Sequence, residues 1–293
     1  MSSTALSIIT QSSDPVDTAG RNSEPVLVEN EEHHWDDIFT LEDFEALLQN
    51  ANLPADQVHV FYRGKNITAA SNIPEAIKEA IPRIGNRYDN DRLFRAYSSN
   101  ECSIRIINAF RFHPKINEMV EKLLDETRIM VSANIYYSPK PEQRILPLHK
   151  DRKEVYISQI SGKKRMFFAE KNQGDPAVDS ITNYIEYSAG DNLYIPMGVP
   201  HCGQSIDGHS LHLTWGFRAH SISRFLQYVL SQDESLNRVL EQSIGLKQNQ
   251  QLEPDYEALE KCTRKLQKTI GRALRDRELL DGYLKSDRIA CDL

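Results

Sequence analysis

The stretch EVYISQIS (154–161), followed by KRMFFAE (164–170), belongs to a series of six short runs rich in Ile, Val, Tyr and Phe. The other runs are IMVSANIYY (129–137), NYIEYS (183–188), NLYIP (192–196) and HSLHLTWGF (209–217). Turn signals separate the runs: Ser138-Pro139, Ser161-Gly162, Ala189-Gly190-Asp191 and Asp207-Gly208. Short strands joined by tight turns, with no helix between them, predict an antiparallel sandwich or barrel rather than a parallel α/β sheet.

Helical patterns lie on both sides of this β-rich part. Thr40 is placed to cap a helix, with Asp43 at the capping-box position, and Pro114 is placed to begin a second, strongly amphipathic helix. Between them, Asn72-Ile73-Pro74 opens a further helix, and VHVFYRG (58–64) and SIRIINAF (103–110) predict strands. We expect the helices to pack on the outside of the sheet.

The composition suggests three segments. Residues 1–32 are polar and without periodicity, which predicts a disordered leader. Residues 33–219 hold the β core with its N-terminal helices. Residues 220–293 carry apolar side chains at helical spacing, near Ile222 and over about 255–276, and these helices need a packing partner such as a second copy of the chain.

Charge and cysteine usage limit the cellular setting. The chain of 293 residues has a formal net charge of -7, which disfavours nonspecific nucleic-acid binding. No apolar run is long enough to span a membrane, and the N-terminus lacks the features of a secretory signal. Cysteines at 102, 202, 262 and 291 form no CxxC pair, so we expect reduced thiols and a cytoplasmic protein.

Seven Lys and Arg residues within 261–277 predict a solvated helix face; a site for an acidic peptide or nucleic acid is the alternative.

Three side chains form a candidate metal site. His149 and Asp151 are two residues apart, so on an extended strand both point to the same side. His201, at the end of GDNLYIPMGVPH (190–201), is the best third ligand. Two imidazoles and one carboxylate leave half of a metal's coordination sphere open, as non-haem Fe(II) oxygenases require, whereas zinc sites more often use three His or Cys ligands. A surface turn, or a cupin-like barrel that has lost its metal, is the alternative.

These motifs resemble a known family. LPLHKDRKEVYISQISGKKRMFF (146–168), GDNLYIPMGVPH, LTWGFR (213–218) and IINAFRFHP (106–114) are similar to JmjC oxygenases of the ribosomal-oxygenase type. The resemblance implies a double-stranded β-helix (jelly-roll/cupin) core. It also implies Fe(II) as the metal, 2-oxoglutarate as cosubstrate and O₂ as oxidant, together with dimerising helices after the core.

The resemblance also implies a cosubstrate site. Lys164 stands where the family has the basic residue that binds the distal carboxylate of 2-oxoglutarate, and Lys163 is the alternative. The predicted turn at Ser161-Gly162 would independently bring this cation beside the strand of His149, where a charge-assisted hydrogen bond to a dicarboxylate is strong. Further positions match pocket-lining residues of the family: Asn134, Tyr136, Ser138 and Thr214.

The expected function is therefore hydroxylation of an amino-acid side chain in a protein or peptide. PKPEQRILPL (139–148) is charged where relatives are glycine-rich, and this loop borders the substrate entrance. A hydroxylase of a free amino acid or of a peptide natural product is thus an open alternative. The sequence is also compatible with a non-catalytic cupin-like binding protein, and with an interaction scaffold built on the C-terminal helices.

Overall fold

The computed structural model divides the chain into two compact units, residues 1–219 with the last four residues, and residues 220–289. The residues that it describes are 24–29, 35–50, 52–62, 65–66, 89–127, 129–141, 146–170, 180–218, 225–229, 246–248, 252–254, 256–273, 275–279 and 283. The helix predicted to open at Asn72 lies outside these residues.

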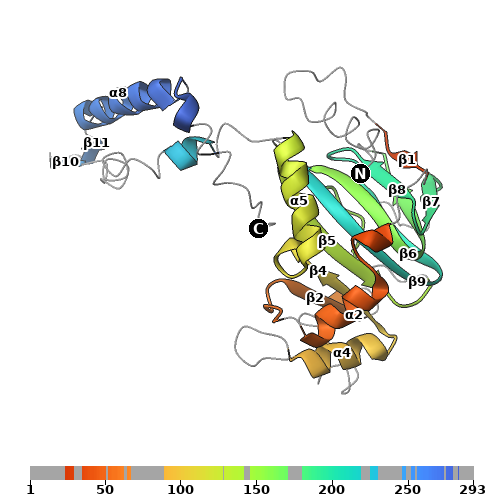
Figure 1. The fold of residues 1–293 in the computed structure, drawn as a ribbon. Helices are drawn as coiled ribbons and strands as arrows, with labels where there is room; N and C mark the ends of the chain where they lie inside the picture. Colours follow the sequence, from red (N-terminus) through yellow and green to blue (C-terminus); the bar gives the residue numbers. More distant parts are fainter. Residues whose placement is uncertain are drawn as a thin grey trace. The chain divides into compact units, whose positions relative to one another are not determined.

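The first unit is built on one antiparallel sheet (Figure 1). In the described residues its order is β1-β8-β6-β9-β5-β4-β2-β3, with β7 paired to β6. The strands are β1 (Val26–Val28), β2 (Val58–Tyr62), β3 (Lys65–Asn66), β4 (Cys102–Ile106), β5 (Met130–Ser138), β6 (Glu154–Phe168), β7 (Tyr184–Ser188), β8 (Asn192–Ile195) and β9 (His201–Arg218). The predicted fold class, a mainly β core of the jelly-roll type with flanking helices, is confirmed.

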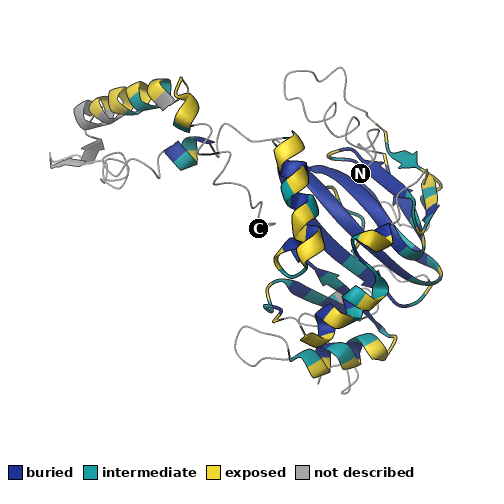
Figure 2. Ribbon diagram, in the orientation of Figure 1, coloured by how far each residue is buried: buried dark blue, intermediate teal, exposed yellow. Residues whose placement is uncertain are grey.

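Helices cover one face of this sheet (Figure 1). They are α2 (Leu41–Asn50), α4 (Asn90–Ser98), α5 (Pro114–Thr127) and the short 3₁₀ turns η1 (Trp35–Asp37) and η2 (Ala109–Arg111). The predicted capping box of α2 is confirmed, because Asp43 N–H donates to Thr40 Oγ1 at 3.1 Å while Thr40 N–H donates to Asp43 Oδ2 at 3.0 Å. Figure 2 shows buried strands beneath helices whose outer sides are exposed.

Alternate residues of β6 face two different cores. Tyr156 and Ile160 join the large cluster beneath the helices, which also contains Phe44 of α2 and Val120 of α5. Val155, Ile157 and Met166 belong instead to a second cluster, on the sheet face that points away from the helices. This second face is where the candidate site lies.

Two predicted turns do not reverse the chain. Residues 154–168 form one strand instead of two, because β6 continues through two register shifts against β9, one between Gln159 and Ser161 and one between Gly162 (φ 73°) and Lys163. Opposite it, β9 runs on through Asp207 and Gly208, and the pairing shifts from Gly162↔Ser210 to Lys163↔Ile206. A β-bulge bends and twists a strand pair without ending it. The strands β6 and β9 therefore stay paired before and after the irregularity.

Two other predictions also need correction. Within the segment predicted to be a disordered leader, Val26–Val28 form β1 and pair with β8, because Val26 and Leu27 pack against the two cores. The strand predicted over 103–110 ends at Ile106, because Asn108 takes a left-handed conformation (φ 53°) and starts η2. Cys102 and Cys202 are buried and form no disulfide, as expected.

The second unit contains the predicted C-terminal helix as α8 (Tyr256–Ala273). Its basic side chains are exposed where described, and Arg264 pairs with Glu260 at 2.7 Å. Helical residues 225–229 place Phe225 and Val229 against Tyr283. The sequence did not predict the two-stranded sheet of β10 (Leu246–Gln248) and β11 (Leu252–Pro254). No helix among the described residues is long and apolar enough to cross a membrane.

Candidate metal centre

Backbone pairing brings the two histidines together. His149 and His201 form an isolated antiparallel bridge, in which each backbone N–H donates to the other residue's carbonyl oxygen, at 3.1 and 2.9 Å. The loop before His201 is held as well, because Gly198 N–H donates to the carbonyl oxygen of Asp151 at 2.9 Å. The segment from His149 to Asp151 and the loop that presents His201 are therefore held together by backbone hydrogen bonds.

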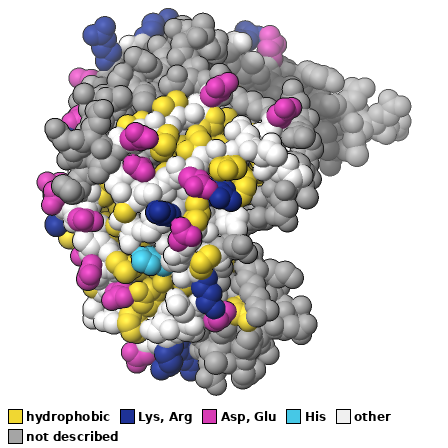
Figure 3. Space-filling view, turned by 90° about the vertical axis from the view of Figure 1, so that its right-hand side faces the viewer, with side chains coloured by type: hydrophobic (Ala, Val, Ile, Leu, Met, Phe, Trp, Pro, Cys, Tyr) yellow, Lys and Arg dark blue, Asp and Glu magenta, His cyan; other side chains and the backbone are white. Residues whose placement is uncertain are grey.

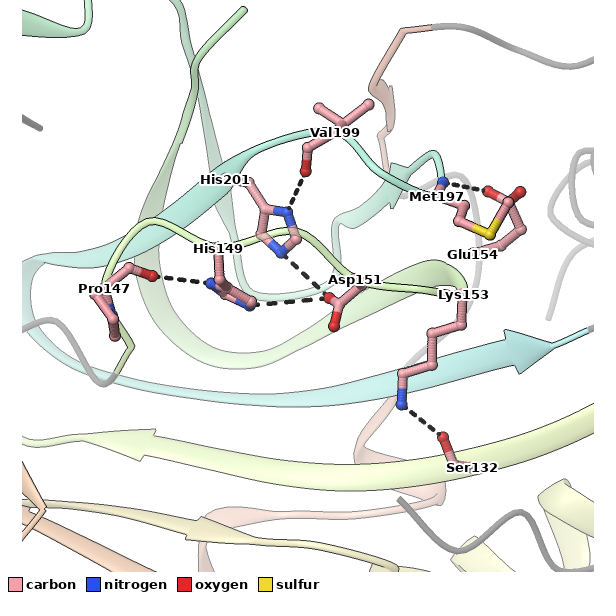
Figure 4. Close-up of polar contacts among 9 residues, drawn as sticks. All are labelled: Ser132, Pro147, His149, Asp151, Lys153, Glu154, Met197, Val199 and His201. Atoms are coloured by element: carbon pink, nitrogen blue, oxygen red, sulfur yellow. Dashed lines mark hydrogen bonds and ion pairs between the residues drawn. The ribbon is translucent and has the colours of Figure 1, made fainter. Parts of the chain in front are cut away.

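The three predicted ligands converge (Figure 4). One ligand atom from each of His149, Asp151 and His201 lies within 4.8 Å of the others. Oδ2 of Asp151 is 3.5 Å from Nε2 of His201 and 3.9 Å from Nε2 of His149. His201 is buried, whereas the other two side chains are partly exposed, so this cluster opens towards solvent on one side.

Hydrogen bonds orient both imidazoles. Nδ1 of His149 donates to the carbonyl oxygen of Pro147, and Nδ1 of His201 donates to that of Val199, each at 2.9 Å. A carbonyl oxygen only accepts, so the proton of each ring resides on Nδ1 and the lone pair of Nε2 faces Asp151. Burial, and then the neighbouring His149, lower the pKa of His201 and favour the neutral ring that a metal needs.

The donor set fits a divalent metal. Two neutral Nε2 atoms and one carboxylate, already turned towards one another, match the facial triad of non-haem Fe(II) sites and leave room for further ligands. Oriented histidines with carbonyl acceptors are the usual surroundings of such ligands.

A cavity of about 50 Å³ adjoins these residues. Its wall is formed by Tyr136, Leu146, His149, Asp151, Val155, Ile157, Lys164, Met166, His201, Gly203, His212 and Thr214. Lys164 is only 3% exposed, and burial lowers its pKa to about 7. Lys163, its neighbour, is exposed. The cavity thus joins the three candidate ligands to a desolvated amine.

The other predicted pocket residues divide into two groups. Tyr136 and Thr214 line the cavity. Asn134 and Ser138 are buried but are not among the lining residues, and Oδ1 of Asn134 accepts a hydrogen bond from the backbone N–H of Asn108 at 3.0 Å. Even spacing on β5 placed these residues on one face, but it did not show how far the cavity extends along the strand.

His212 is a polar residue of the cavity wall that was not among the predicted site residues. Its Nδ1 lies 3.2 Å from Nζ of Lys164, and its ring stacks on Tyr136 with 4.9 Å between centroids. Burial, together with the charge of Lys164, lowers the pKa of His212 well below its usual value. The available signal was its spacing of two from Thr214, which puts both side chains on one face of β9.

A bent antiparallel β core that presents two oriented imidazoles and a carboxylate beside a cavity defines a cupin-type protein with a candidate non-haem metal centre. Residues 105–225 match the family model described as a JmjC domain. The predicted resemblance to JmjC oxygenases of the ribosomal-oxygenase type is thereby confirmed.

Similar proteins are known in sequence and in structure. The chain is 33% identical over 134 residues to the bifunctional lysine-specific demethylase and histidyl-hydroxylase NO66 of Drosophila mojavensis, and 26% identical over 213 residues to ribosomal oxygenase 1 of Danio rerio. These matches cover 40% and 65% of this chain but only 15% and 36% of those proteins. The fold resembles the ribosomal oxygenase YcfD of Escherichia coli in complex with cobalt and 2-oxoglutarate, with a TM-score of 0.58, 18% identity, and coverage of 92% of this chain and 69% of that one.

Proposed function

We propose that this chain is an Fe(II)- and 2-oxoglutarate-dependent dioxygenase that hydroxylates an amino-acid side chain in a protein or peptide. The observation that carries the proposal is that His149, Asp151 and His201 meet beside a cavity that also contains the buried amine of Lys164. The similarity to proteins named as a histidyl-hydroxylase and a ribosomal oxygenase supports the same function.

Each group has a role in this proposal. His149, Asp151 and His201 would hold Fe(II), and Lys164 would pair with the distal carboxylate of 2-oxoglutarate, beside Tyr136 and Thr214. When bound, the iron with 2-oxoglutarate and O₂ supplies hydroxylation of a C–H bond, with succinate and CO₂ as the other products. Because no carboxylate among the described residues pairs with Lys164, its ammonium is available to an incoming dicarboxylate.

Apolar side chains complete the cavity. Val155, Ile157 and Met166 line it and belong to the buried second core. They make the wall beside the amine apolar, and a low local dielectric strengthens the pairing of Lys164 with an anion.

The described part of the face in Figure 3 fits a peptide partner better than a polyanion. On the face drawn in Figure 3, acidic and basic side chains of the described residues are spread among apolar ones and are not gathered by sign. Such a face offers apolar contacts and individual polar groups, without the basic stripe that nucleic acid requires. A homodimer formed through residues 220–293 and a cytoplasmic location stay predictions.

The test is coupled turnover. We expect the purified chain, given Fe(II), 2-oxoglutarate and ribosomal proteins or their peptides, to form succinate together with a product heavier by one oxygen atom in mass spectra. A His149→Ala variant is expected to form neither. His209→Ala is the matched control, because His209 contacts Ser161 at 2.8 Å and is not among the cavity-lining residues. Equal turnover by His149→Ala would refute the assignment.

A further inference from the structure

A buried carboxylate lies next to the candidate metal centre without belonging to it. Glu154, the first residue of β6, is 7% exposed. One of its oxygens, Oε2, accepts two hydrogen bonds, from the hydroxyl of Tyr194 and from the backbone N–H of Met197, each at 2.8 Å. Figure 4 shows this carboxylate at Met197, with Asp151 and His201 further along the same two segments.

The second of these bonds reaches the loop that presents His201. Residues 196–200 connect β8 to His201, and Val199 supplies the carbonyl oxygen to which Nδ1 of His201 donates. The loop is also bound through backbone contacts, from Gly198 N–H to Asp151 and from Val199 N–H to Pro196. The contact from Glu154 differs from these because a side chain makes it, so it can be removed without changing the backbone.

The hydrogen bond between Glu154 and Met197 connects the two segments that carry candidate ligands. Glu154 follows Asp151 by three residues, so its carboxylate joins the strand that leaves one candidate ligand to the loop that carries another. A buried carboxylate is expensive to desolvate, and an apolar residue of similar size often serves stability as well or better. The two hydrogen bonds that Glu154 accepts therefore indicate that it fixes the position of the loop rather than adding stability.

We propose that Glu154 is a positioning residue of the metal centre, which holds loop 196–200 so that Nε2 of His201 faces Asp151. It acts through Met197 and Val199 and is not one of the three side chains that converge. The inference rests on the proposed function only in that the three converging side chains bind a metal.

The experiment measures metal affinity without turnover. Co(II) is titrated calorimetrically into the metal-free full-length protein and its variants, and circular dichroism checks that each variant is folded. We expect Glu154→Ala to weaken Co(II) binding by about 10- to 100-fold, the usual effect of losing a group that orients a ligand. Glu154→Gln keeps an acceptor oxygen near Met197, and we expect it to restore affinity to within about threefold of the wild type.

Tyr194→Phe is the matched control. It removes the other donor to the same oxygen but leaves the bond to the loop, so we expect thermal stability to fall while Co(II) affinity is retained. If Glu154→Ala does not fold, Glu154→Asp replaces it, because the shorter side chain withdraws the acceptor from Met197 and weakens binding in the same direction.

The outcomes separate the two proposals. Wild-type Co(II) affinity in a folded Glu154→Ala or Glu154→Asp variant would overturn the positioning role and leave the proposed function intact. Equal losses of affinity in Tyr194→Phe and Glu154→Ala would also overturn it, because a general loss of packing would then explain both. A wild-type chain that binds no Co(II) would overturn the proposed function together with this inference.

Discussion

Nζ of Lys164 lies 3.2 Å from Nδ1 of His212, and both side chains are buried in the wall of one cavity. A neutral imidazole can accept a hydrogen bond from the ammonium through Nδ1, but it adds no negative charge. Burial lowers the pKa of Lys164 to about 7, so close to neutral pH this residue changes between a cation and a neutral amine. Ligand affinity and stability should both depend on that change.

The affinity for 2-oxoglutarate should fall as the pH rises above about 7. Below that value Lys164 is already charged, whereas above it the amine must take up a proton when the dicarboxylate binds, at a cost of up to about tenfold in affinity per pH unit. Calorimetry on the Co(II)-loaded protein at about pH 6.5 and about pH 8.5 measures this dependence. Lys164→Arg should flatten it, because a guanidinium stays charged. A wild-type affinity that is the same at both values would contradict the prediction.

Replacing Lys164 by Met should stabilise the protein most at low pH. Below about pH 7 the amine is protonated in both states, and the folded state carries the full cost of burying the charge. Between about 7 and the ordinary value of 10.5, the folded state releases the proton and the unfolded state keeps it, so wild-type stability rises with pH. The advantage of Lys164→Met should therefore shrink across that window in urea unfolding. Lys163→Met, at an exposed position, serves as the control; a destabilised Lys164→Met at low pH would disprove this account.

Two glycines with positive φ should respond differently to alanine. A Cβ on Gly162 (φ 73°) would lie 1.9 Å from the carbonyl oxygen of His209, so the bulge has no space for it. A Cβ on Gly198 (φ 81°) would meet nothing within 4 Å, so only backbone strain of about 1–2 kcal/mol opposes it. Urea unfolding should show a clearly larger loss for Gly162→Ala. Similar losses for the two variants would mean that the bulge relaxes.

Metal binding should raise the unfolding free energy of the wild type. A ligand that binds only the folded state at about 100 times its Kd adds about 2.7 kcal/mol. We expect thermal scans with Co(II), compared with scans in a chelator, to show a higher midpoint for the wild type but not for His201→Ala. A midpoint shift that survives this substitution would indicate binding elsewhere.

The three candidate ligands could be predicted from patterns within short stretches of the sequence. His149 and Asp151 were found because residues two apart share a side of an extended segment, and His201 because it ends a Pro-bounded loop after an apolar strand. Both signals act over a few residues, and the structure brings the three side chains together. The capping box at Thr40 is local in the same way.

The choice between Lys163 and Lys164 could not be made from alternation. Val155 and Ile157 face the cavity, and strict alternation from them would put Lys163 on the same side. The register shift between Gln159 and Ser161, where β6 has one residue more than β9, moves the alternation by one residue, so that Lys164 and Met166 face the cavity instead. A Ser-Gly pair is compatible with a turn or with a continuing, irregular strand. Which of the two forms depends on the pairing with β9, which is distant in the sequence.

The pairing of β1 with β8 has a practical consequence. Val26, Leu27 and Val28 cover one side of β8, while β6 covers the other. If the first thirty or so residues were trimmed as dispensable, the backbone of β8 would lose its outer partner and become an open template for strands of other molecules. Shortened versions intended for crystallisation should therefore begin before Glu24, or they will gain a tendency to self-associate beside the very loop that carries His201.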